Sequence, residues 1–99
     1  MNIHKTHCQD QTTLNLSGRL DTVTAPALLD VLVSEFDNAN DVIVDFAGLN
    51  YVSSPGLHVL IAGEKTAKSK GKKQTLANIS NEIMEVIEIA GCSNYLHFA

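Results

Sequence analysis

The sequence predicts an α/β domain, with a mixed sheet of four or five strands and three to four helices covering it. Three observations support this fold class. Residues 42–46 form a nearly unbroken apolar, β-branched run of strand length, residues 12–17 alternate between apolar and polar, and apolar residues recur at helical spacing in three other segments. Strand and helix patterns follow one another through short connections, without a linker or a repeat.

The N-terminal segments predict a hairpin. Residues 12–17 alternate as a strand does when one of its faces is buried. Residues 3–8 can pair with that strand through a turn at Gln9-Asp10-Gln11. Gly18 and Asp21 are expected to end the strand region, because both residue types favour turns.

A first helix is predicted to run to about Asp37. Thr22 or Thr24 can cap its start, and Pro26 suits its first turn. Its apolar stripe, spaced i, i+3, i+4 and i+7, consists of Ala25, Leu28, Leu29, Leu32 and Phe36. We therefore expect this helix to bury one face against the sheet.

The next strand is predicted from Asp41 to Phe46. A continuous apolar run is typical of a strand that is covered on both faces of an α/β sheet. Gly48 and Asn50 are expected to break this strand. The residues that follow would then leave the sheet and enter a helix.

A second helix is predicted from about Ser54 to Ser69. Ser53 or Ser54 can serve as its N-cap, and Pro55 suits its first position. Leu57, Leu60 and Ile61 then recur at helical spacing. A serine at this start lies beside unpaired backbone N–H groups and the positive end of the helix dipole, a place that favours a phosphate.

The C-terminal third predicts a strand, a helix and a short closing strand. A strand at residues 74–78 would follow the second helix by a right-handed crossover and lie parallel to its neighbour. Ser80 or Asn81 can cap a third helix, and Gly91 suits the position after its end. The apolar face of that helix would consist of Ile83, Val86, Ile87 and Ala90. Residues 95–98 are predicted to form an edge strand.

Length and composition predict one domain spanning residues 1–99, and they narrow the class of protein. Apolar residues make up 44 % and charged residues 18 %, as in ordinary globular proteins. No apolar run reaches the length of a membrane helix, and the N-terminus lacks a hydrophobic signal core, so we expect a cytoplasmic protein without membrane insertion. A net charge of −4 argues against a nucleic-acid-binding surface.

Five of the seven basic residues nevertheless cluster near the end of the second helix: Lys65, Lys68, Lys70, Lys72 and Lys73. Cations complement the dipole at a helix C-terminus, and Gly71 helps to end the helix. The cluster therefore favours a solvated helix end. A patch that steers an acidic partner is the alternative.

The cysteines and histidines indicate neither a metal site nor a redox motif. Cys8 and Cys92 have no C-x-x-C spacing and no nearby set of ligands. The four histidines are also scattered, and only His4 and His7 are close in sequence. We expect reduced thiols and no cofactor.

Several residues between the first strand and the second helix are candidates for chemistry. Asp21 is equally consistent with a turn former and a functional carboxylate, whereas Asp45 is expected to bind loop amides. Ser54, His58 and Asp45 are the right types for a nucleophile, a base and an orienting acid. No G-x-S-x-G elbow is present and the chain is short, so we do not expect an enzyme.

Three ordered segments resemble the STAS-domain anti-sigma-factor antagonists. Leu49-Asn50-Tyr51-Val52-Ser53-Ser54-Pro55-Gly56-Leu57 resembles their phosphorylation loop, and Ser17 to Pro26 resembles the Gly-x-Leu-Asp segment that leads into their first helix. Residues 65–91 follow the family's order of a basic helix end, a glycine, a short strand and a last amphipathic helix. The resemblance covers nearly the whole chain and implies the STAS fold.

The resemblance places the phosphorylation acceptor at Ser54, with Ser53 as the alternative, and associates Asp21 with kinase engagement. Ser53 stands where many members have Asp, and Pro55 stands where they have a small residue. A partner surface is implied around both loops. Its residues would be Asp21, Thr22, Thr24, Ser53, Pro55, Gly56, Leu57 and His58.

The function that the resemblance implies is partner switching in transcription regulation. The unphosphorylated chain would bind an anti-sigma factor of the histidine-kinase-like ATPase type. That partner would phosphorylate Ser54 with its own ATP and Mg²⁺, and a serine phosphatase would reset the chain. The alternative function is a STAS subunit docked permanently on a lipid transport ATPase without phosphorylation, which Pro55 and the absence of Asp before Ser54 favour.

Overall fold

A four-stranded mixed sheet forms the centre of the molecule, as the sequence predicted. The computed structural model describes residues 1–99, and the strands lie in the order β1 (Asn2–Cys8), β2 (Gln11–Leu20), β3 (Asp41–Val52) and β4 (Gln74–Ala77). β1 and β2 are antiparallel and form the predicted hairpin, whereas the β2–β3 and β3–β4 pairs are parallel.

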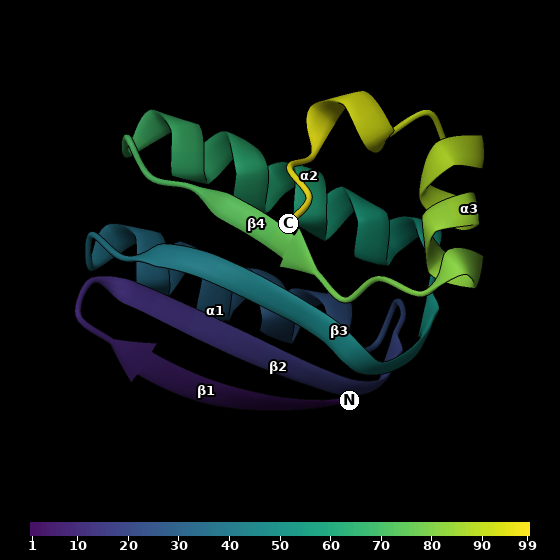
Figure 1. Ribbon diagram of the computed structural model, residues 1–99, viewed down its shortest axis with the longest axis horizontal. Coiled ribbons are helices and arrows are strands. Elements are labelled where there is room, and N and C mark those ends of the chain that lie inside the picture. Colours follow the sequence, from purple (N-terminus) through teal and green to yellow (C-terminus); the bar gives the residue numbers. More distant parts are fainter.

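Two helices cover one face of this sheet (Figure 1). α1 (Ala25–Asp37) connects β2 to β3, and α2 (Ser54–Ser69) connects β3 to β4. The strand order advances in one direction, so two crossovers of the same hand place both helices on the same side. None of the helices combines the length and the apolar character that crossing a bilayer requires.

The prediction that β3 is covered on both faces was therefore wrong. Val42, Val44 and Phe46 are buried under the helices, whereas Ile43 and Asp45 between them are only partly buried on the open face. The apolar run reflected strand propensity and one buried face. The 21 buried apolar residues form a single core between the sheet and the helices.

β3 is also longer than predicted, because Gly48 and Asn50 do not break it. The pairing with β2 shifts register twice. β3 has one extra residue between Asp45 and Gly48 and another between Leu49 and Tyr51, as in β-bulges. A Cβ at Gly48 would lie 2.8 Å from the carbonyl oxygen of Leu16. The glycine thus permits a close approach of two strands and does not end the strand.

α3 (Asn81–Ile89) lies beyond the end of the sheet toward which β4 points (Figure 1). Ser80 caps it by accepting a hydrogen bond from the backbone N–H of Ile83 at 3.2 Å. Ile83 and Ile87 are buried, but Val86 and Ala90 are exposed, which corrects the predicted apolar face. A helix at the end of a sheet has only a narrow stripe covered.

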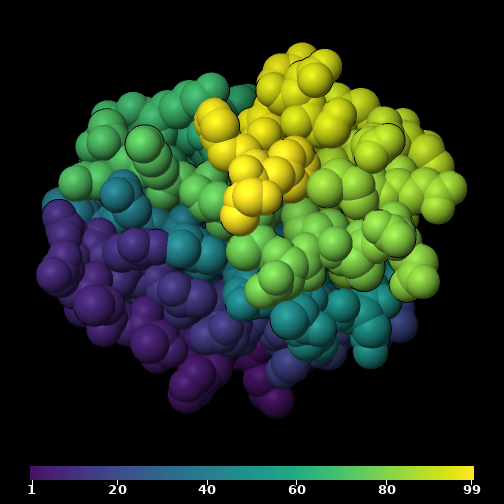
Figure 2. Space-filling view, viewed as in Figure 1, coloured from purple at the N-terminus to yellow at the C-terminus, as the bar shows by residue number.

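The predicted edge strand at residues 95–98 is reduced to one parallel bridge, between Leu76 of β4 and Phe98. A short 3₁₀ helix, η1 (Ser93–Tyr95), takes up the residues before it. Leu96 is buried and anchors this turn. The tail therefore lies against β4 without adding a complete fifth strand, and Figure 2 shows it crossing the surface beside β4 and α3.

Candidate functional site

The junction between β3 and α2 presents two neighbouring serines in different states. Ser53 is the N-cap, with extended backbone, and its Oγ accepts a hydrogen bond from the backbone N–H of Gly56 at 3.3 Å. Of the two serines that the sequence offered as the N-cap of this helix, Ser53 is therefore the one that caps it. Pro55 is the second helical residue, one place later than predicted, because Ser54 is the first.

The side chain of Ser54 makes no contact that stabilises the fold. Its side chain is exposed, and its hydroxyl makes no hydrogen bond within the chain. The residue lies in the first turn of a 16-residue helix, where backbone N–H groups point outward and the dipole favours negative charge. Its hydroxyl is therefore accessible to another molecule and is placed where an added anion is stabilised.

The loop is held against the end of β2. The backbone N–H of Ser53 donates a hydrogen bond to the carbonyl oxygen of Leu20 at 2.9 Å. Gly56 packs so closely that a Cβ there would lie 2.7 Å from Cγ of Leu20. Leu57 is 2 % exposed. Gly56 and Leu57, which the resemblance placed in the partner surface, are thus buried and position the loop.

Leu20 leads into the second loop of the site, which Asp21 organises. Asp21 Oδ1 accepts hydrogen bonds from the backbone N–H groups of Val23 and Thr24 and from the Thr24 hydroxyl, each at 3.1 Å. The Thr24 backbone bond is the largest cause that lowers the pKa of Asp21, and the Thr24 hydroxyl, Val23 and Arg19 add to it against the opposing effect of desolvation. Asp21 is therefore a turn former that remains charged at neutral pH.

The hydroxyl of Thr24 also lies 2.9 Å from the carbonyl oxygen of Arg19, so its single proton is shared between that oxygen and Asp21 Oδ1, and the side chain closes the turn. Thr24 is the N-cap residue of α1, but its side chain makes no capping hydrogen bond. Thr22, in contrast, is exposed. Of the two threonines predicted for the partner surface, Thr22 is the one with an exposed side chain.

Around these loops lie exposed groups that the sequence reasoning missed. The guanidinium of Arg19 lies 4.1 Å from the centroid of the Tyr51 ring, a cation–π contact, and Val23 is 86 % exposed. Arg19 and Tyr51 are direct neighbours across β2 and β3. Only the register beyond the two irregularities brings them together, so no local pattern could have indicated the pair.

Ser54, His58 and Asp45 do not form a hydrogen-bonded catalytic triad. Asp45 accepts hydrogen bonds from the backbone N–H of Ala47 at 2.9 Å and from Nδ2 of Asn78 at 3.1 Å. Its backbone partner therefore lies within β3 and not in a loop, whereas Asn78 lies in the loop after β4. Asp45 makes no bond to His58, which is exposed on α2. No group of three potential metal-ligating side chains is present, and both cysteines are free thiols.

A four-stranded mixed sheet with two helices on one face, and with a serine-bearing loop at the start of α2, defines this chain as a small α/β domain of the STAS class. A family model described as "Mlab, STAS domain" matches residues 3–97. The chain belongs to the STAS domain family, which confirms the family predicted from the three segments.

Curated relatives point in the same direction. The chain is 28 % identical over 98 residues to an anti-sigma-B factor antagonist of Staphylococcus epidermidis, covering 98 % of this chain and 91 % of the relative. It is 26 % identical over 83 residues to the anti-sigma-B factor antagonist of Bacillus subtilis (strain 168), covering 84 % and 76 %.

Solved structures share the fold. The anti-sigma factor antagonist SpoIIAA in its unphosphorylated form superposes with a TM-score of 0.84 at 16 % identity, covering 99 % of this chain and 88 % of that one. The Bacillus SpoIIAA in its phosphorylated form gives a TM-score of 0.76 at 15 % identity, covering 99 % and 91 %.

Proposed function

We propose that this chain is an anti-sigma-factor antagonist that binds its partner while Ser54 carries no phosphate. The observation that carries the proposal is the division of roles between two adjacent serines: Ser53 caps α2, and Ser54 leaves its hydroxyl exposed and unbonded. The anti-sigma-B factor antagonists among the relatives support the role. The two forms of SpoIIAA, which share this fold, support control by phosphate.

Phosphorylation at Ser54 would act on the interface and leave the fold intact. A phosphate adds about −1.5 to −2 charges at neutral pH. The first turn of α2 favours negative charge, so the domain tolerates the dianion. A partner surface packed closely against the same turn would lose contact through repulsion and bulk. The charge therefore changes binding at this place and does not unfold the protein.

The partner in this scheme is an anti-sigma factor that is also a serine kinase of the histidine-kinase-like ATPase type. It brings its own ATP and Mg²⁺, and a serine phosphatase removes the phosphate later. Binding would use the exposed members of the two loops, Thr22, Val23, Ser54, Pro55 and His58, beside the Arg19–Tyr51 pair. Binding of the anti-sigma factor frees a sigma factor, so this activity belongs in the cytoplasm. In this scheme the chain is a binding partner and a kinase substrate.

Intact-mass measurement after incubation with a candidate kinase and Mg-ATP tests the proposal. Wild type should gain one phosphate, and Ser54→Ala should gain none. Ser53→Ala is the matched control, since it removes the neighbouring hydroxyl and should keep the phosphate.

Two results would count against this scheme. If Ser54→Ala is still phosphorylated and Ser53→Ala is not, the phosphorylated residue is Ser53. No phosphate with any such kinase, together with stable binding to a transport ATPase, would support the permanently docked subunit.

A further inference from the structure

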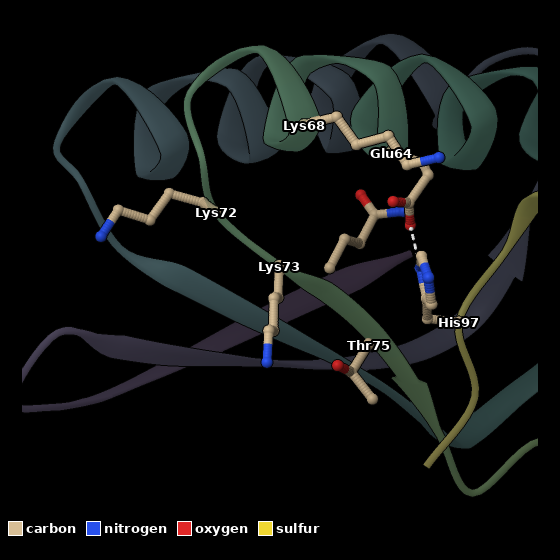
Figure 3. Close-up of a pocket in the computed structure, with 7 residues that line it drawn as sticks. Glu64, Lys68, Lys72, Lys73, Thr75 and His97 are labelled. Carbon is tan, nitrogen blue, oxygen red and sulfur yellow. Dashed lines mark hydrogen bonds and ion pairs between the residues drawn. The ribbon is translucent and has the colours of Figure 1, made fainter.

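The largest cavity of the molecule lies far from the two loops, at the other end of α2. It has a volume of about 390 Å³. Glu64 and Lys68 of α2 line it, together with Lys72 and Lys73 before β4, Gln74 of β4, and His97 of the C-terminal tail. Figure 3 shows that these side chains come from the helix, the sheet edge and the tail, that Glu64 and His97 face each other, and that the three lysine side chains extend in different directions.

The three lysines around this cavity have no partner. None of them forms an ion pair, although the chain carries a net charge of −4. Lys70, in the same basic segment, does pair with Asp37 at 3.2 Å and does not line the cavity. Like charges repel, so three unpaired ammonium groups at one hollow create a positive potential that an anion would relieve. The arrangement supports the alternative that the sequence left open, a basic patch that attracts an acidic group.

The inner wall of the cavity carries hydrogen-bond acceptors, in contrast to the cationic lysines around it. Glu64 is buried, and its Oε1 lies 3.0 Å from Nδ1 of His97, the contact drawn in Figure 3. Gln74 is 1 % exposed, and its Nε2 donates to the carbonyl oxygen of Leu60 at 2.8 Å. Its Oε1 has no hydrogen-bond partner. The carboxylate of Glu64 therefore offers acceptor oxygens at the wall, which suit hydroxyl or amino donors, whereas Gln74 Oε1 faces Gly63.

Small adjustments are enough to let a ligand use both walls. Lys68 and Lys73 are exposed, so their flexible stems can turn their ammonium groups toward the hollow. The Gln74 amide stays in place, because its hydrogen bond to the carbonyl oxygen of Leu60 holds it against α2. Gly63 leaves the space that this amide occupies, because a Cβ there would lie 2.2 Å from Oε1 of Gln74.

We infer that this cavity binds a small phosphorylated compound that also carries hydroxyl or amino groups. The phosphate or diphosphate lies among Lys68, Lys72 and Lys73, and the donors reach Glu64. Lysine is a common phosphate ligand, and three ammonium groups match the charge of a diphosphate. The same phosphate could be free in solution or belong to a lipid headgroup.

This site is separate from Ser54. Lys68 follows Ser54 by fourteen positions in α2, which places the two residues about 21 Å apart along the helix axis. Binding here does not depend on the proposed phosphorylation. Failure of one proposal leaves the other intact, because the ligand experiment uses unphosphorylated protein without a partner.

Titration followed by NMR tests the inference with four probes: ADP, pyrophosphate, adenosine, and vesicles that contain phosphatidylglycerol. ADP and pyrophosphate should give saturable shifts at the amides of residues 72–75 and 97, and adenosine should give none. Lys72→Ala and Lys73→Ala should each weaken ADP binding about tenfold, the loss expected for one charge-assisted contact. Lys70→Ala is the matched control and should change it less than about twofold.

Glu64→Gln tests the inner wall, because it keeps the shape and removes the negative charge. It should strengthen pyrophosphate binding and reduce the advantage of ADP over pyrophosphate. Vesicle binding that Lys72→Ala weakens and Lys70→Ala does not would support the site and assign the phosphate to a lipid. Three results would overturn the inference: shifts that do not saturate, equal shifts with adenosine, or an equal loss in Lys70→Ala.

Discussion

Ser53 Oγ accepts a hydrogen bond from the backbone N–H of Gly56 at 3.3 Å, and this contact fixes where α2 begins. Since the cap is provided by Ser53, the exposed Ser54 beside it makes no contribution of that kind to the helix. A residue without a structural role can change its charge without unfolding the domain. This separation allows the stability and the switching of one loop to be tested independently.

The first prediction concerns the stability of the two serine variants. Ser53→Ala should lower the free energy of unfolding by about 1 kcal/mol, because it removes the N-cap. Ser54→Ala should change it by less than about 0.5 kcal/mol, as expected for an exposed residue. Urea denaturation of both variants measures the difference. An equal loss in both would contradict the assignment of the cap.

The second prediction concerns a permanent negative charge at the start of α2. Ser54→Glu should abolish binding to the anti-sigma partner while the fold is retained. Its stability should rise by about 0.3–1 kcal/mol, because the charge complements the helix dipole. Binding is measured by calorimetry and stability by thermal unfolding.

Ser69→Glu provides the matched control for that experiment, since it places the same charge at the exposed C-terminal end of α2. Partner binding should stay unchanged, and stability should fall, because the dipole there disfavours negative charge. Weakened binding in both variants would indicate a general charge effect and would remove the support for the Ser54 loop.

The third prediction concerns the close approach of α2 to β2. Gly56→Ala should destabilise the domain by about 1–3 kcal/mol, because its Cβ would lie 2.7 Å from Cγ and 3.1 Å from the carbonyl oxygen of Leu20. Pro55→Ala, at the exposed neighbouring position, should have a smaller effect. Denaturant unfolding compares the two, and a tolerated Gly56→Ala would show that this contact is not tight.

The fourth prediction concerns pH. Glu35 of α1 is buried, and desolvation alone would raise its pKa. Hydrogen bonds from Thr12, Lys5 and Asn40, together with the charge of Lys5, outweigh that effect and lower the pKa below its ordinary value of 4.5. The stability contributed by the carboxylate is therefore present above pH 4.5 and is lost as the pH falls through the lower folded-state pKa.

Glu35→Gln tests this by unfolding measurements over a pH series. The variant should be less stable than wild type at neutral pH by about 1–3 kcal/mol, and the difference should shrink below pH 4.5. Asp37→Asn is the control, because Asp37 is exposed and pairs only at the surface with Lys70. A difference that stays constant across the series would show that the charge of Glu35 is not responsible.

Much of the fold could be predicted because local patterns determine local structure. The hairpin of β1 and β2, the start and end of α2, and the cap of α3 depend on residues within a few positions of one another. The same is true of the loop around Ser54, whose residue types already indicated a helix start. Whether the side chain of Ser54 is exposed depends on how α2 packs against the sheet, which the sequence does not show.

The sequence by itself determined the order of the elements, the family and the place of the serine loop, because periodicity, caps and turn residues act over short distances. Only the tertiary structure decided which serine caps α2, how far β3 extends past Gly48, and that one face of the sheet stays open. It also brought Arg19 to Tyr51 and His97 to Glu64. These features depend on strand register and on packing between segments that are distant in sequence, and no local pattern encodes them.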